Sequence, residues 1–495
     1  MRRILSIFAL ALNLSAQSKA PKIWDDKALE DWATPIAGVG VRPGHFSSAE
    51  YYAVAAQNLK TYPVYRPDRE PPGYWDSLQR QKPQLLVDPS KIHSQEDWIK
   101  AGEAAFQTMV DPVSRRDDAA AIQAARDLAA YDGVWTMRDG TLPVLRWVVT
   151  EHGVELATTA CAPCHRRPQA DGTVAWGVPV GAPPPGSRRF TPTLPPRLGP
   201  RLPFVGDTRQ TTFWRAFTVP WAPDPRIEAI HDMADEAFAA ARPGLGSIVP
   251  DAVFDRIHGS PFYTTKIPDL NNIRFSRYID ATGTHRLRGP EDIARYAAFV
   301  TGADPMEFGQ YRILTPEQRR IHFRFADEEL YAIGMYLMSL DPSKNPDVAP
   351  ADLVSRGSEI FTREACARCH VPPNYTSGKL TLAQGFTPVA DHPNRADILT
   401  ISVGTDPGLA MKTRKGTGFY KIPSLRGLWY RPVLLHDGSV ASLEEMFDPD
   451  RLKQDHVPGG WKGPGVTNRA IPGHPFGLAL NAEDKRALLS FLRSL

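Results

Sequence analysis

The chain has 495 residues and a formal net charge of +3, with acidic and basic residues interspersed. This length predicts two to four domains, since a domain typically holds about 100 to 200 residues. The balanced charge excludes the basic stripe of a nucleic-acid-binding protein and a polybasic membrane anchor, so no nucleic-acid partner is expected. The 47 prolines predict a modest share of regular structure and long ordered loops.

Residues 1–20 have the pattern of a secretory signal peptide. Met1-Arg2-Arg3 is followed by a mostly apolar run over residues 4–12 and then by small and polar residues at 15–18. The apolar run is too short to cross a bilayer, and no later run approaches the roughly 18 apolar residues of a spanning helix. We therefore expect a protein with no membrane span that is exported to the periplasm or elsewhere outside the cytoplasm. A short membrane anchor that stays uncleaved is the alternative interpretation.

Residues 21–140 contain no cysteine and no recognisable catalytic motif, and we expect an N-terminal extension that covers the domain after it. Helical spacing predicts helices over 95–110 and 118–131, with N-caps at Ser94 and Asp117. The extension is rich in Trp and Tyr. These rings are better explained as filling a loop-rich core than as an electron relay.

All four cysteines lie in two copies of a Cys-x-x-Cys-His pattern. Cys161, Cys164 and His165 form the first copy, and Cys366, Cys369 and His370 form the second. Two thiols three residues apart on one helical turn present both sulfurs to the vinyl groups of one porphyrin, and the adjacent histidine can reach its iron. We therefore predict two covalently bound haem c groups, with His165 and His370 as proximal iron ligands.

Two other interpretations use the same cysteines: a disulfide within each pair, or a four-cysteine zinc site built from both pairs. Neither explains a histidine directly after each pair. A zinc ribbon also closes its second pair within about 15 to 20 residues of the first. Here about 200 residues separate the two pairs.

Apolar residues at helical spacing lead into both motifs. The pattern predicts one helix over residues 141–165 and another that ends just before Cys366. Gly153 stands eight residues before the first motif, and Gly357 stands nine before the second. A small residue at these positions would let each helix pass close to another helix or to a porphyrin edge.

The features that follow the motifs occur twice in the same order. Lys-Ile-Pro at residues 266–268 precedes His285, and Lys-Ile-Pro at 421–423 precedes His436. Each half then ends in a segment with the apolar spacing of an amphipathic helix. An internal duplication accounts for this repeated order.

The sequence therefore predicts a mainly α fold with two cytochrome c-like haem domains, extensive loops and an N-terminal extension. The expected boundaries are 1–20 for the signal peptide, 21–140 for the extension, 141–342 for the first haem domain and 343–495 for the second. The polar, proline-containing segment 341–350 reads as the boundary between the haem domains. A second proline-rich stretch, 178–203, is either a polyproline linker or an ordered loop on the distal side of the first haem. We prefer the loop because the stretch lies inside a haem domain.

Residues 141–495 resemble the bacterial di-haem cytochrome c peroxidase superfamily, which also contains the enzyme that matures methylamine dehydrogenase and the di-haem rubber oxygenases. The resemblance is carried by both Cys-x-x-Cys-His motifs, Lys-Ile-Pro-Ser-Leu-Arg at 421–426, His-Asp-Gly-Ser at 436–439 and Leu-Glu-Glu at 443–445. It implies two mainly helical haem domains that face each other. One haem would react with peroxide or dioxygen, and the other would store or relay electrons. Calcium (Ca2+), often found between the domains in this family, is a further candidate cofactor.

The second haem departs from the typical peroxidases of this superfamily, whose sixth ligand is a methionine. Asp450 holds the corresponding position, fourteen residues beyond His436. His474, flanked by glycine just before the last helix, resembles the position from which the rubber oxygenases supply a second histidine. We predict His474 as the distal ligand of the second haem, ahead of Met446 and Met411, with an exposed loop histidine as the alternative. Two histidines would give that haem a lower potential than His and Met.

The first haem also departs from that pattern, because no histidine occurs between His165 and His231. Its sixth position is then open, as reaction with peroxide or dioxygen requires, or is filled by a distant residue. The candidates for such a ligand are His258, His285 and His322.

His285 and His436 hold paired positions in the two halves. Both are better explained as hydrogen-bonding partners of haem propionates or of the backbone than as iron ligands. Arg286 and Arg288 either pair with propionates or belong to a solvated face.

These features predict an oxidoreductase that reduces peroxide, or uses peroxide or dioxygen, at the first haem. The second haem would relay electrons from a small redox partner protein, with Trp176, Trp214 or Trp221 between the haems. The alternative is a pure electron-transfer cytochrome in which both irons are six-coordinate. A haem module docked on a larger dehydrogenase is a third interpretation.

Overall fold

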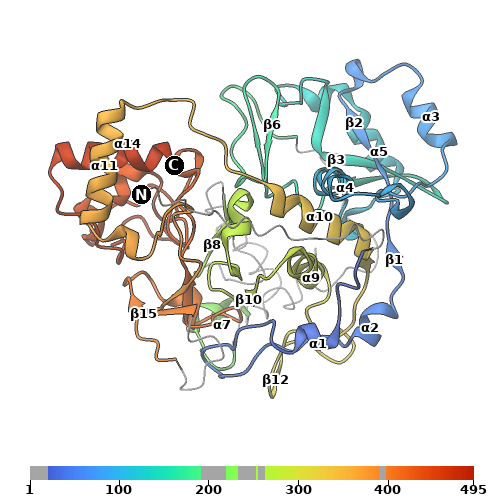
Figure 1. The fold of residues 1–495 in the computed structure, drawn as a ribbon. Helices are drawn as coiled ribbons and strands as arrows, with labels where there is room; N and C mark the ends of the chain where they lie inside the picture. The colour runs from blue at the N-terminus through green and yellow to red at the C-terminus, as the bar shows by residue number, and fades with distance from the viewer. Residues whose placement is uncertain (1–19, 191–218, 232–251, 255–261, 389–396) are drawn as a thin grey trace, which may run out of the picture.

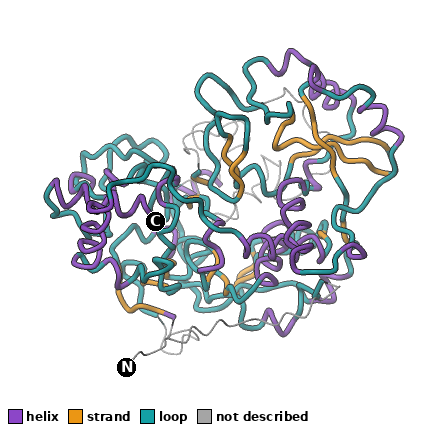
Figure 2. The backbone as a smooth tube through the Cα atoms, turned by 45° about the horizontal axis from the view of Figure 1, so that its top comes forward, coloured by secondary structure: helices purple, strands orange, loops and turns teal. Residues whose placement is uncertain are grey.

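The computed structural model describes residues 20–190, 219–231, 252–254, 262–388 and 397–495. The predicted signal peptide, except for its last residue, lies outside these ranges, as do His258, Trp214 and residues 191–203 of the proline-rich stretch. Helices account for 32% of the structure and strands for 15%. Long loops connect them, as the proline content predicts (Figures 1 and 2).

The helices follow the apolar spacing and caps of the sequence over most of the chain. The α-helices are α1 (Asp26–Leu29), α2 (Ser48–Tyr52), α3 (Tyr74–Arg80), α4 (Gln95–Thr108), α5 (Ala119–Arg126), α7 (Pro225–His231), α9 (Pro290–Thr301), α10 (Asp327–Ser339), α11 (Ala351–Arg363), α12 (Gly408–Met411), α13 (Leu443–Met446) and α14 (Ala482–Ser494). The 3-10 helices are η1 (Pro67–Arg69), η2 (Pro89–Lys91), η3 (Pro112–Ser114), η4 (Leu128–Tyr131), η5 (Leu270–Phe275), η6 (Cys366–Arg368), η8 (Leu428–Tyr430) and η9 (Pro449–Leu452).

The caps of two predicted helices can be compared directly with the structure. Ser94 caps α4 as predicted, because its side chain accepts a hydrogen bond from the backbone N–H of Asp97. The cap predicted at Asp117 is wrong: Asp118 caps α5 by accepting from Ala121 N–H. Asp127 then interrupts the predicted 118–131 helix and caps the short η4 that follows.

The strands form small separate sheets. They are β1 (Ala56–Gln57), β2 (Thr61–Tyr65), β3 (Thr141–Thr150), β4 (Gly153–Thr158), β5 (Arg166–Pro168), β6 (Val174–Trp176), β7 (Val253–Phe254), β8 (Thr265–Lys266), β9 (Tyr278–Ile279), β10 (His285–Arg286), β11 (Glu307–Phe308), β12 (Tyr311–Arg312), β13 (Arg324–Phe325), β14 (Leu380–Leu382), β15 (Ile398–Ser402) and β16 (Phe419–Lys421). The most extensive sheet is antiparallel in the order β2-β3-β4. A second three-stranded sheet, β15-β14-β16, belongs to the C-terminal half.

The helix predicted over residues 141–165 is wrong, because this segment forms the β3-β4 hairpin. Val148 and Val149 are both buried, as is Leu156 on the returning strand. With both faces of β3 covered, the apolar residues do not alternate with polar ones, so their spacing also fits a helix. Gly153 lies at the hairpin turn with φ 127°, not at a helix crossing.

The close helix crossings of the two halves are made by Gly102 and Gly357. A Cβ added to Gly102 on α4 would lie 1.8 Å from the carbonyl oxygen of Ala332 on α10. A Cβ added to Gly357 on α11 would lie 2.2 Å from the carbonyl oxygen of Ala487 on α14. The close approach predicted at Gly357 is confirmed, and its counterpart in the first half lies on α4 (Figure 1).

The two crossings are also alike in their aromatic contacts. In each helix, an aromatic residue lies four positions after the glycine or alanine of the crossing. Phe106 of α4 packs against Tyr336 of α10, with ring centroids 5.6 Å apart. Phe361 of α11 packs against Phe491 of α14 at 5.4 Å. Both helix pairs therefore have the same sequence spacing of four residues from Gly to the aromatic residue on one helix and from Ala to the aromatic residue on the other.

The chain between α4 and the first motif leaves this helix and returns to it. Asp111 N–H donates to the carbonyl of Thr158 at 2.9 Å, and Ala160 N–H donates to the carbonyl of Met109 at 2.8 Å. The first motif therefore begins beside the C-terminal end of α4, although about 50 residues intervene in the sequence. In the second half, α11 ends at Arg363 and leads directly into Cys366.

Each Lys-Ile-Pro segment pairs with the opposite half of the chain. Lys266 N–H donates to the carbonyl of His436 at 2.8 Å. Lys421 N–H donates to the carbonyl of Ala281 at 2.8 Å. Each Lys-Ile-Pro segment thus donates a backbone hydrogen bond to the other half, and the two bonds connect the halves.

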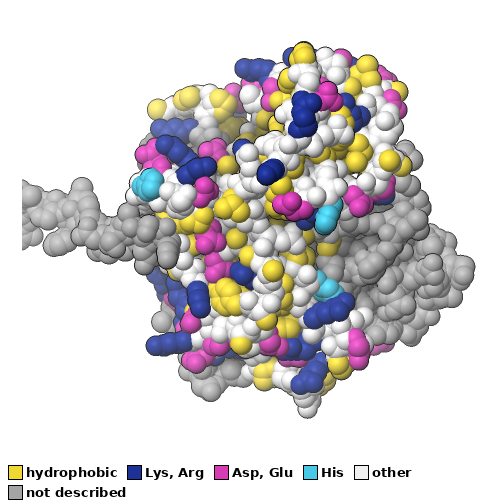
Figure 3. Space-filling model, turned by 90° about the vertical axis from the view of Figure 1, so that its right-hand side faces the viewer, with side chains coloured by type: hydrophobic (Ala, Val, Ile, Leu, Met, Phe, Trp, Pro, Cys, Tyr) yellow, Lys and Arg dark blue, Asp and Glu magenta, His cyan; other side chains and the backbone are white. Residues whose placement is uncertain are grey.

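The described helices include none that is both long and apolar enough to cross a membrane. On the face shown in Figure 3, described Lys and Arg side chains are interspersed with Asp, Glu and hydrophobic side chains. The mixed surface agrees with the small net charge and does not produce a strong field of one sign over this face.

Candidate functional site

The two Cys-x-x-Cys-His motifs form the same backbone turn. In the first, the N–H groups of Cys164 and His165 both donate to the carbonyl of Cys161, at 3.2 Å each. In the second, Cys369 and His370 donate to the carbonyl of Cys366 at 3.2 and 2.9 Å. None of the four cysteines forms a disulfide in the structure. The turn places each histidine next to its cysteine pair, as attachment of a porphyrin requires.

The loops after the motifs are also held alike. The carbonyl of Cys164 accepts a hydrogen bond from Val180 N–H, and that of Cys369 accepts one from Ser377 N–H, both at 2.9 Å. The Lys-Ile-Pro segments reach the same loops. Leu270 N–H donates to the carbonyl of Gly177 at 2.8 Å, and Leu425 N–H donates to that of Tyr375 at 3.2 Å.

His370 is oriented for iron binding through Nε2. Its Nδ1 lies 3.2 Å from the carbonyl oxygens of Tyr375 and Pro423, both of which can only accept. Nδ1 therefore carries the proton, which leaves the Nε2 lone pair for a metal. Burial lowers the pKa of His370 to about 4, so the ring is neutral at pH 7, as a ligand must be.

His474 faces His370. Their ring centroids lie 6.5 Å apart at an interplanar angle of 51°. Two imidazoles on opposite sides of one iron, with metal–nitrogen bonds of about 2.0 Å, have ring centroids roughly 6 Å apart. Nδ1 of His474 is buried and has no hydrogen-bond partner among the described residues. Burial, together with the nearby His370 and Arg451, lowers its pKa to about 4. The pair fits a six-coordinate haem iron.

The other residues considered as second-haem ligands are placed differently from one another: Met446 lies in the apolar cluster against which Cys366 packs, whereas Met411 is not part of that cluster. Met446 is buried in the core between α11 and α14, and Met411 packs with Leu409 and Tyr420. Asp450, at the position of the methionine ligand in typical peroxidases, forms an exposed ion pair with Lys453.

The paired histidines His285 and His436 lie in hydrogen-bonded and aromatic contacts. His436 stacks on Tyr420 with ring centroids 4.3 Å apart, and its Nε2 lies 3.2 Å from the Tyr420 hydroxyl. His285 Nδ1 lies 2.9 Å from the Thr284 hydroxyl, and the ring centroids of His285 and Trp32 lie 4.1 Å apart. For His436 these contacts favour the structural interpretation, whereas Nε2 of His285 is buried without a hydrogen-bond partner among the described residues.

The two arginines next to His285 bind carboxylates of the protein. Arg286 and Arg288 form ion pairs with Asp31 at 2.7 and 3.0 Å, and Arg288 also binds Asp292 at 2.8 Å. Of the described tryptophans proposed as relays, Trp176 lies in the same cluster as Cys161. Trp221 packs against Phe308 with ring centroids 5.1 Å apart.

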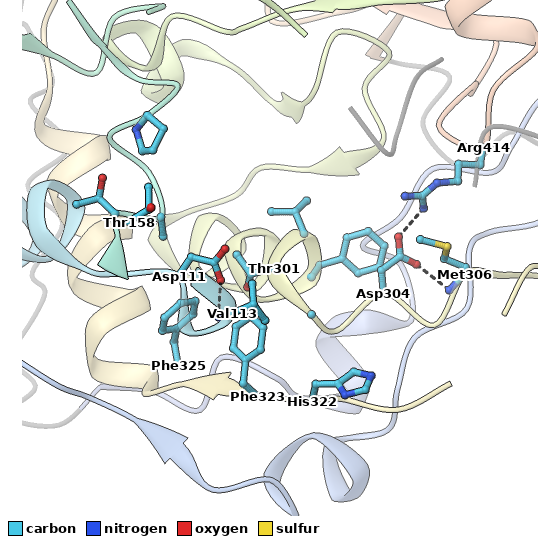
Figure 4. A pocket seen from close by; sticks show the side chains of 16 residues that line it. Asp111, Val113, Thr158, Thr301, Asp304, Met306, His322, Phe323, Phe325 and Arg414 are labelled. Carbon is cyan, nitrogen blue, oxygen red and sulfur yellow. Dashed lines mark hydrogen bonds and ion pairs between the residues drawn. The ribbon is translucent and has the colours of Figure 1, made fainter. Parts of the chain in front are cut away.

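A cavity of about 300 Å³ lies beside the first motif (Figure 4). Ala160, which precedes Cys161, and Pro163, which lies between the two cysteines, are among the lining residues, and Thr158 lies at one end. At the other end, Asp304 accepts hydrogen bonds from Arg414 Nη1 at 2.6 Å and from Met306 N–H at 2.8 Å. The lining residues are Asp111, Val113, Thr158, Thr159, Ala160, Pro163, Phe299, Val300, Thr301, Gly302, Asp304, Met306, His322, Phe323, Phe325 and Arg414.

The cavity wall is mostly apolar with a few polar groups. The Asp304 and Arg414 charges offset each other. The Nε2 atom of His322 is buried without a hydrogen-bond partner among the described residues. Burial lowers the pKa of His322, so its imidazole is neutral at pH 7. A porphyrin attached to Cys161 and Cys164 would border this cavity, because the thioether bonds keep it beside Pro163.

One buried residue beside the second site gives no signal in the sequence. Arg451 follows Asp448-Pro449-Asp450, a pattern typical of an exposed turn. In the structure its side chain is completely buried beneath the loop that carries His474. For calcium, no group of three or more His, Cys, Asp or Glu side chains in the described part of the chain is arranged to hold an ion.

No protein-family model and no curated protein matches the chain. Among solved structures, it is similar to hydrazine synthase from Kuenenia stuttgartiensis at 14% identity and a TM-score of 0.29, covering 61% of this chain and 90% of that one. It is similar to the di-haem peroxidase BthA from Burkholderia thailandensis at 17% identity and a TM-score of 0.27, covering 66% of this chain and 90% of that one. A MauG-like protein associated with microbial copper homeostasis is similar at 17% identity and a TM-score of 0.23, covering 41% of this chain and 57% of that one. Because these TM-scores are all below 0.5, the proposed function rests on the residues of this chain.

Proposed function

We propose that the protein is an exported di-haem c-type cytochrome that acts as an oxidoreductase. Cys161 and Cys164 would bind one haem, with His165 as its proximal ligand. Cys366 and Cys369 would bind the other between His370 and His474. Two cytochrome c-like units derived from one duplicated ancestor would form the two haem domains.

The proposal rests on the contrast between the two motif sites. At the second site, His474 faces His370 at the separation that two ligands of one iron need. The first site borders a cavity that could admit a small molecule. One iron closed by two histidines suits electron transfer, and one iron beside a cavity suits reaction with a small oxidant.

The duplication is supported by particular contacts rather than by overall similarity. In both the Gly102–Ala332 and the Gly357–Ala487 crossing a glycine lies against the carbonyl of an alanine, and the motif turns share their hydrogen bonds. The proposed first unit therefore takes its leading helix from α4. This differs from the expected domain start at residue 141.

Haem c supplies electron transfer and, at an open axial position, reaction of the iron with peroxide or dioxygen. The residues of the chain provide the setting. Tyr375 and Pro423 fix the tautomer of His370, and the aromatic rings of Phe299, Phe323 and Phe325 form part of the apolar wall of the first-site cavity. His322 can hold or accept a proton there at Nε2. A small redox protein outside the cytoplasm would exchange electrons with the second haem.

The test uses carbon monoxide, which binds only a vacant or readily vacated ferrous site. The purified full-length protein is first checked by mass spectrometry for two covalent haems. Its dithionite-reduced visible spectrum is then recorded with and without carbon monoxide. We expect about half of the Soret intensity to shift, because one of two irons is open.

Two single-haem variants assign the reactive site. The Cys366→Ala, Cys369→Ala protein should keep carbon monoxide binding and reaction with hydrogen peroxide. The Cys161→Ala, Cys164→Ala protein should show neither. Absence of a carbon monoxide shift in the native protein would overturn the oxidoreductase proposal in favour of an electron carrier. Reaction at the second haem alone would overturn the assignment of roles.

A further inference from the structure

Arg451 is a buried cation that forms no ion pair with a described carboxylate, although the charges of Glu445 and Asp448 lie near enough to favour its charged form. Its side chain is 0% exposed. Burying a guanidinium is unfavourable unless its donors are bonded, and an apolar side chain would fill the same space at lower cost. The position of Arg451 therefore calls for a specific role of its hydrogen bonds.

Within the described part of the chain, every hydrogen bond of the guanidinium goes to a backbone carbonyl. Nε donates to Met446 O at 3.0 Å, and Nη1 donates to Ile471 O at 2.6 Å. Nη2 donates to Gly473 O at 2.8 Å and to His474 O at 3.0 Å. Three of the four acceptors lie in the short loop 471–474. The planar fork of arginine fixes the direction of several carbonyls at once, which a flexible lysine cannot do.

The backbone of this loop needs such support. Gly473 has φ 81° and His474 has φ 48°, in the left-handed region that non-glycine residues rarely adopt. On its other side, His474 N–H donates to the carbonyl of Val403 at 2.5 Å. A Cβ on residue 473 would lie 2.2 Å from the backbone nitrogen of Thr405. The loop is thus held between residues 403–405 and Arg451.

From these contacts we propose that Arg451 is the positioning residue that keeps His474 directed at His370 as the sixth ligand of the second haem. The inference rests on the proposed ligation of that haem by His474. Because Arg451 fixes the carbonyls of residues 473 and 474, it sets the plane of both peptides and hence the direction of the His474 side chain. Without it, the strained backbone would relax and the ligand would detach more often.

The test compares three variants of the full-length haem protein: His474→Ala, Arg451→Met and Arg295→Met. Arg295 is a matched control, since it is 4% exposed and donates to a backbone carbonyl, that of Ile23, in the other half. Its carboxylate partner Asp292 keeps a second arginine, Arg288. Each reduced variant is examined for the fraction of Soret intensity shifted by carbon monoxide and for the midpoint potential of each haem.

His474→Ala should raise the shifted fraction from about one half to nearly all, because both haems are then open. Arg451→Met should reproduce this result and raise the potential of the second haem, whereas Arg295→Met should leave both readouts as in the native protein. If His474→Ala opens the second haem and Arg451→Met does not, the role of Arg451 is overturned. If His474→Ala leaves that haem closed, the ligation itself is overturned.

If Arg451→Met fails to fold, Arg451→Lys serves as a second variant that tests the same role. Lysine keeps the charge but cannot direct a planar fork at all four carbonyls. We expect the second haem of this variant to bind carbon monoxide several-fold faster than the native second haem. A rate equal to the native one would contradict the inference. Equal opening in Arg451→Met and Arg295→Met would also contradict it, because the effect would then be general destabilisation.

Discussion

Lys415 is a buried cation whose bonding partners come from the other half of the chain. Its Nζ lies 2.9 Å from Asp280 Oδ2 and 2.7 Å from the Tyr296 hydroxyl, and its side chain is 8% exposed. Although burial opposes ionisation of Asp280, the Lys415 ammonium and hydrogen bonds from Tyr296 and Thr284 hold the pKa of that carboxyl well below its usual range. Lys415 thus compensates a buried negative charge between the halves.

Removal of this cation should destabilise the protein strongly. In Lys415→Met the Asp280 carboxylate stays buried without its cation, a change that typically costs about 3–5 kcal/mol. Denaturant unfolding followed by circular dichroism measures the change in the free energy of unfolding. Lys100→Met is the control, because Lys100 pairs with Glu96 on an exposed helix face and should change stability by less than about 0.5 kcal/mol. A loss below about 1 kcal/mol in Lys415→Met would show that this ion pair does not stabilise the fold.

At the scale of secondary-structure elements, the two glycine crossings reverse the usual effect of a Gly→Ala substitution. Alanine in a helix interior normally stabilises by up to about 1 kcal/mol relative to glycine. At Gly102 and Gly357 a methyl group would overlap the carbonyls of Ala332 and Ala487. Each crossing must then open.

Gly102→Ala and Gly357→Ala should therefore each lower stability, by about 1–3 kcal/mol, as overpacked cores do. Gly102→Ala should cost more, since the added Cβ would come closer to its neighbour, 1.8 Å against 2.2 Å. Thermal unfolding measures both variants. Gln107→Ala, on α4 away from the crossing, should leave the melting temperature nearly unchanged. An increase in stability for either glycine variant would show that its helix crossing can accommodate the added methyl group.

Much of the helical framework follows from the sequence, and the exception has a physical cause. Apolar spacing and caps predict α4, α10, α11 and α14. The β3-β4 hairpin is missed because both faces of β3 are covered and its apolar residues show no alternation. As a result, the sequence assigns α4 to the extension, although its Gly102 makes the crossing that Gly357 makes in the other half.

The candidate site also contains residues that the sequence identifies and one that it does not. The motif spacing identifies the four cysteines and their histidines as candidate haem-binding residues. The sequence also identifies the glycine-flanked His474 as a candidate distal ligand. The role proposed for Arg451 has no sequence signal, because the turn residues before it indicate an exposed position. Its burial follows from tertiary packing of residues 446 and 471–474, which local patterns do not contain.

At the scale of the whole molecule, the pKa values of three lysines near the contact between the halves lie below the ordinary value of lysine. Burial is the main cause in each case, and it lowers the pKa of Lys266 to about 7 and those of Lys415 and Lys421 to about 8. The unfolded chain keeps these protons up to pH 10.5 or so. Between about pH 7 and 10 the unfolded state therefore binds more protons than the folded state.

Stability should rise with pH over that window, by on the order of 5 kcal/mol between pH 7 and 9 for the three lysines together. Denaturation midpoints at constant ionic strength measure it. Above about pH 10 the trend should reverse, since burial raises the pKa of tyrosines such as Tyr420 and the folded state then holds the extra protons. Lys266→Met should flatten the rise. A stability that falls steadily from pH 7 to 9 would contradict the assignment.

The residues between α4 and the first motif increase the sequence separation of the helices that meet in the first half. This separation influences the order in which the two helix pairs fold. The helices that meet at Gly102 and Ala332 are 230 residues apart in sequence, whereas those that meet at Gly357 and Ala487 are 130 apart. The difference in loop-closure entropy is only about 0.5 kcal/mol, so the two halves differ little in stability on this account. Folding rates depend more steeply on the sequence separation of contacts. In a chain refolding from denaturant, the C-terminal helix pair therefore closes first and offers the N-terminal half a preformed surface on which to assemble.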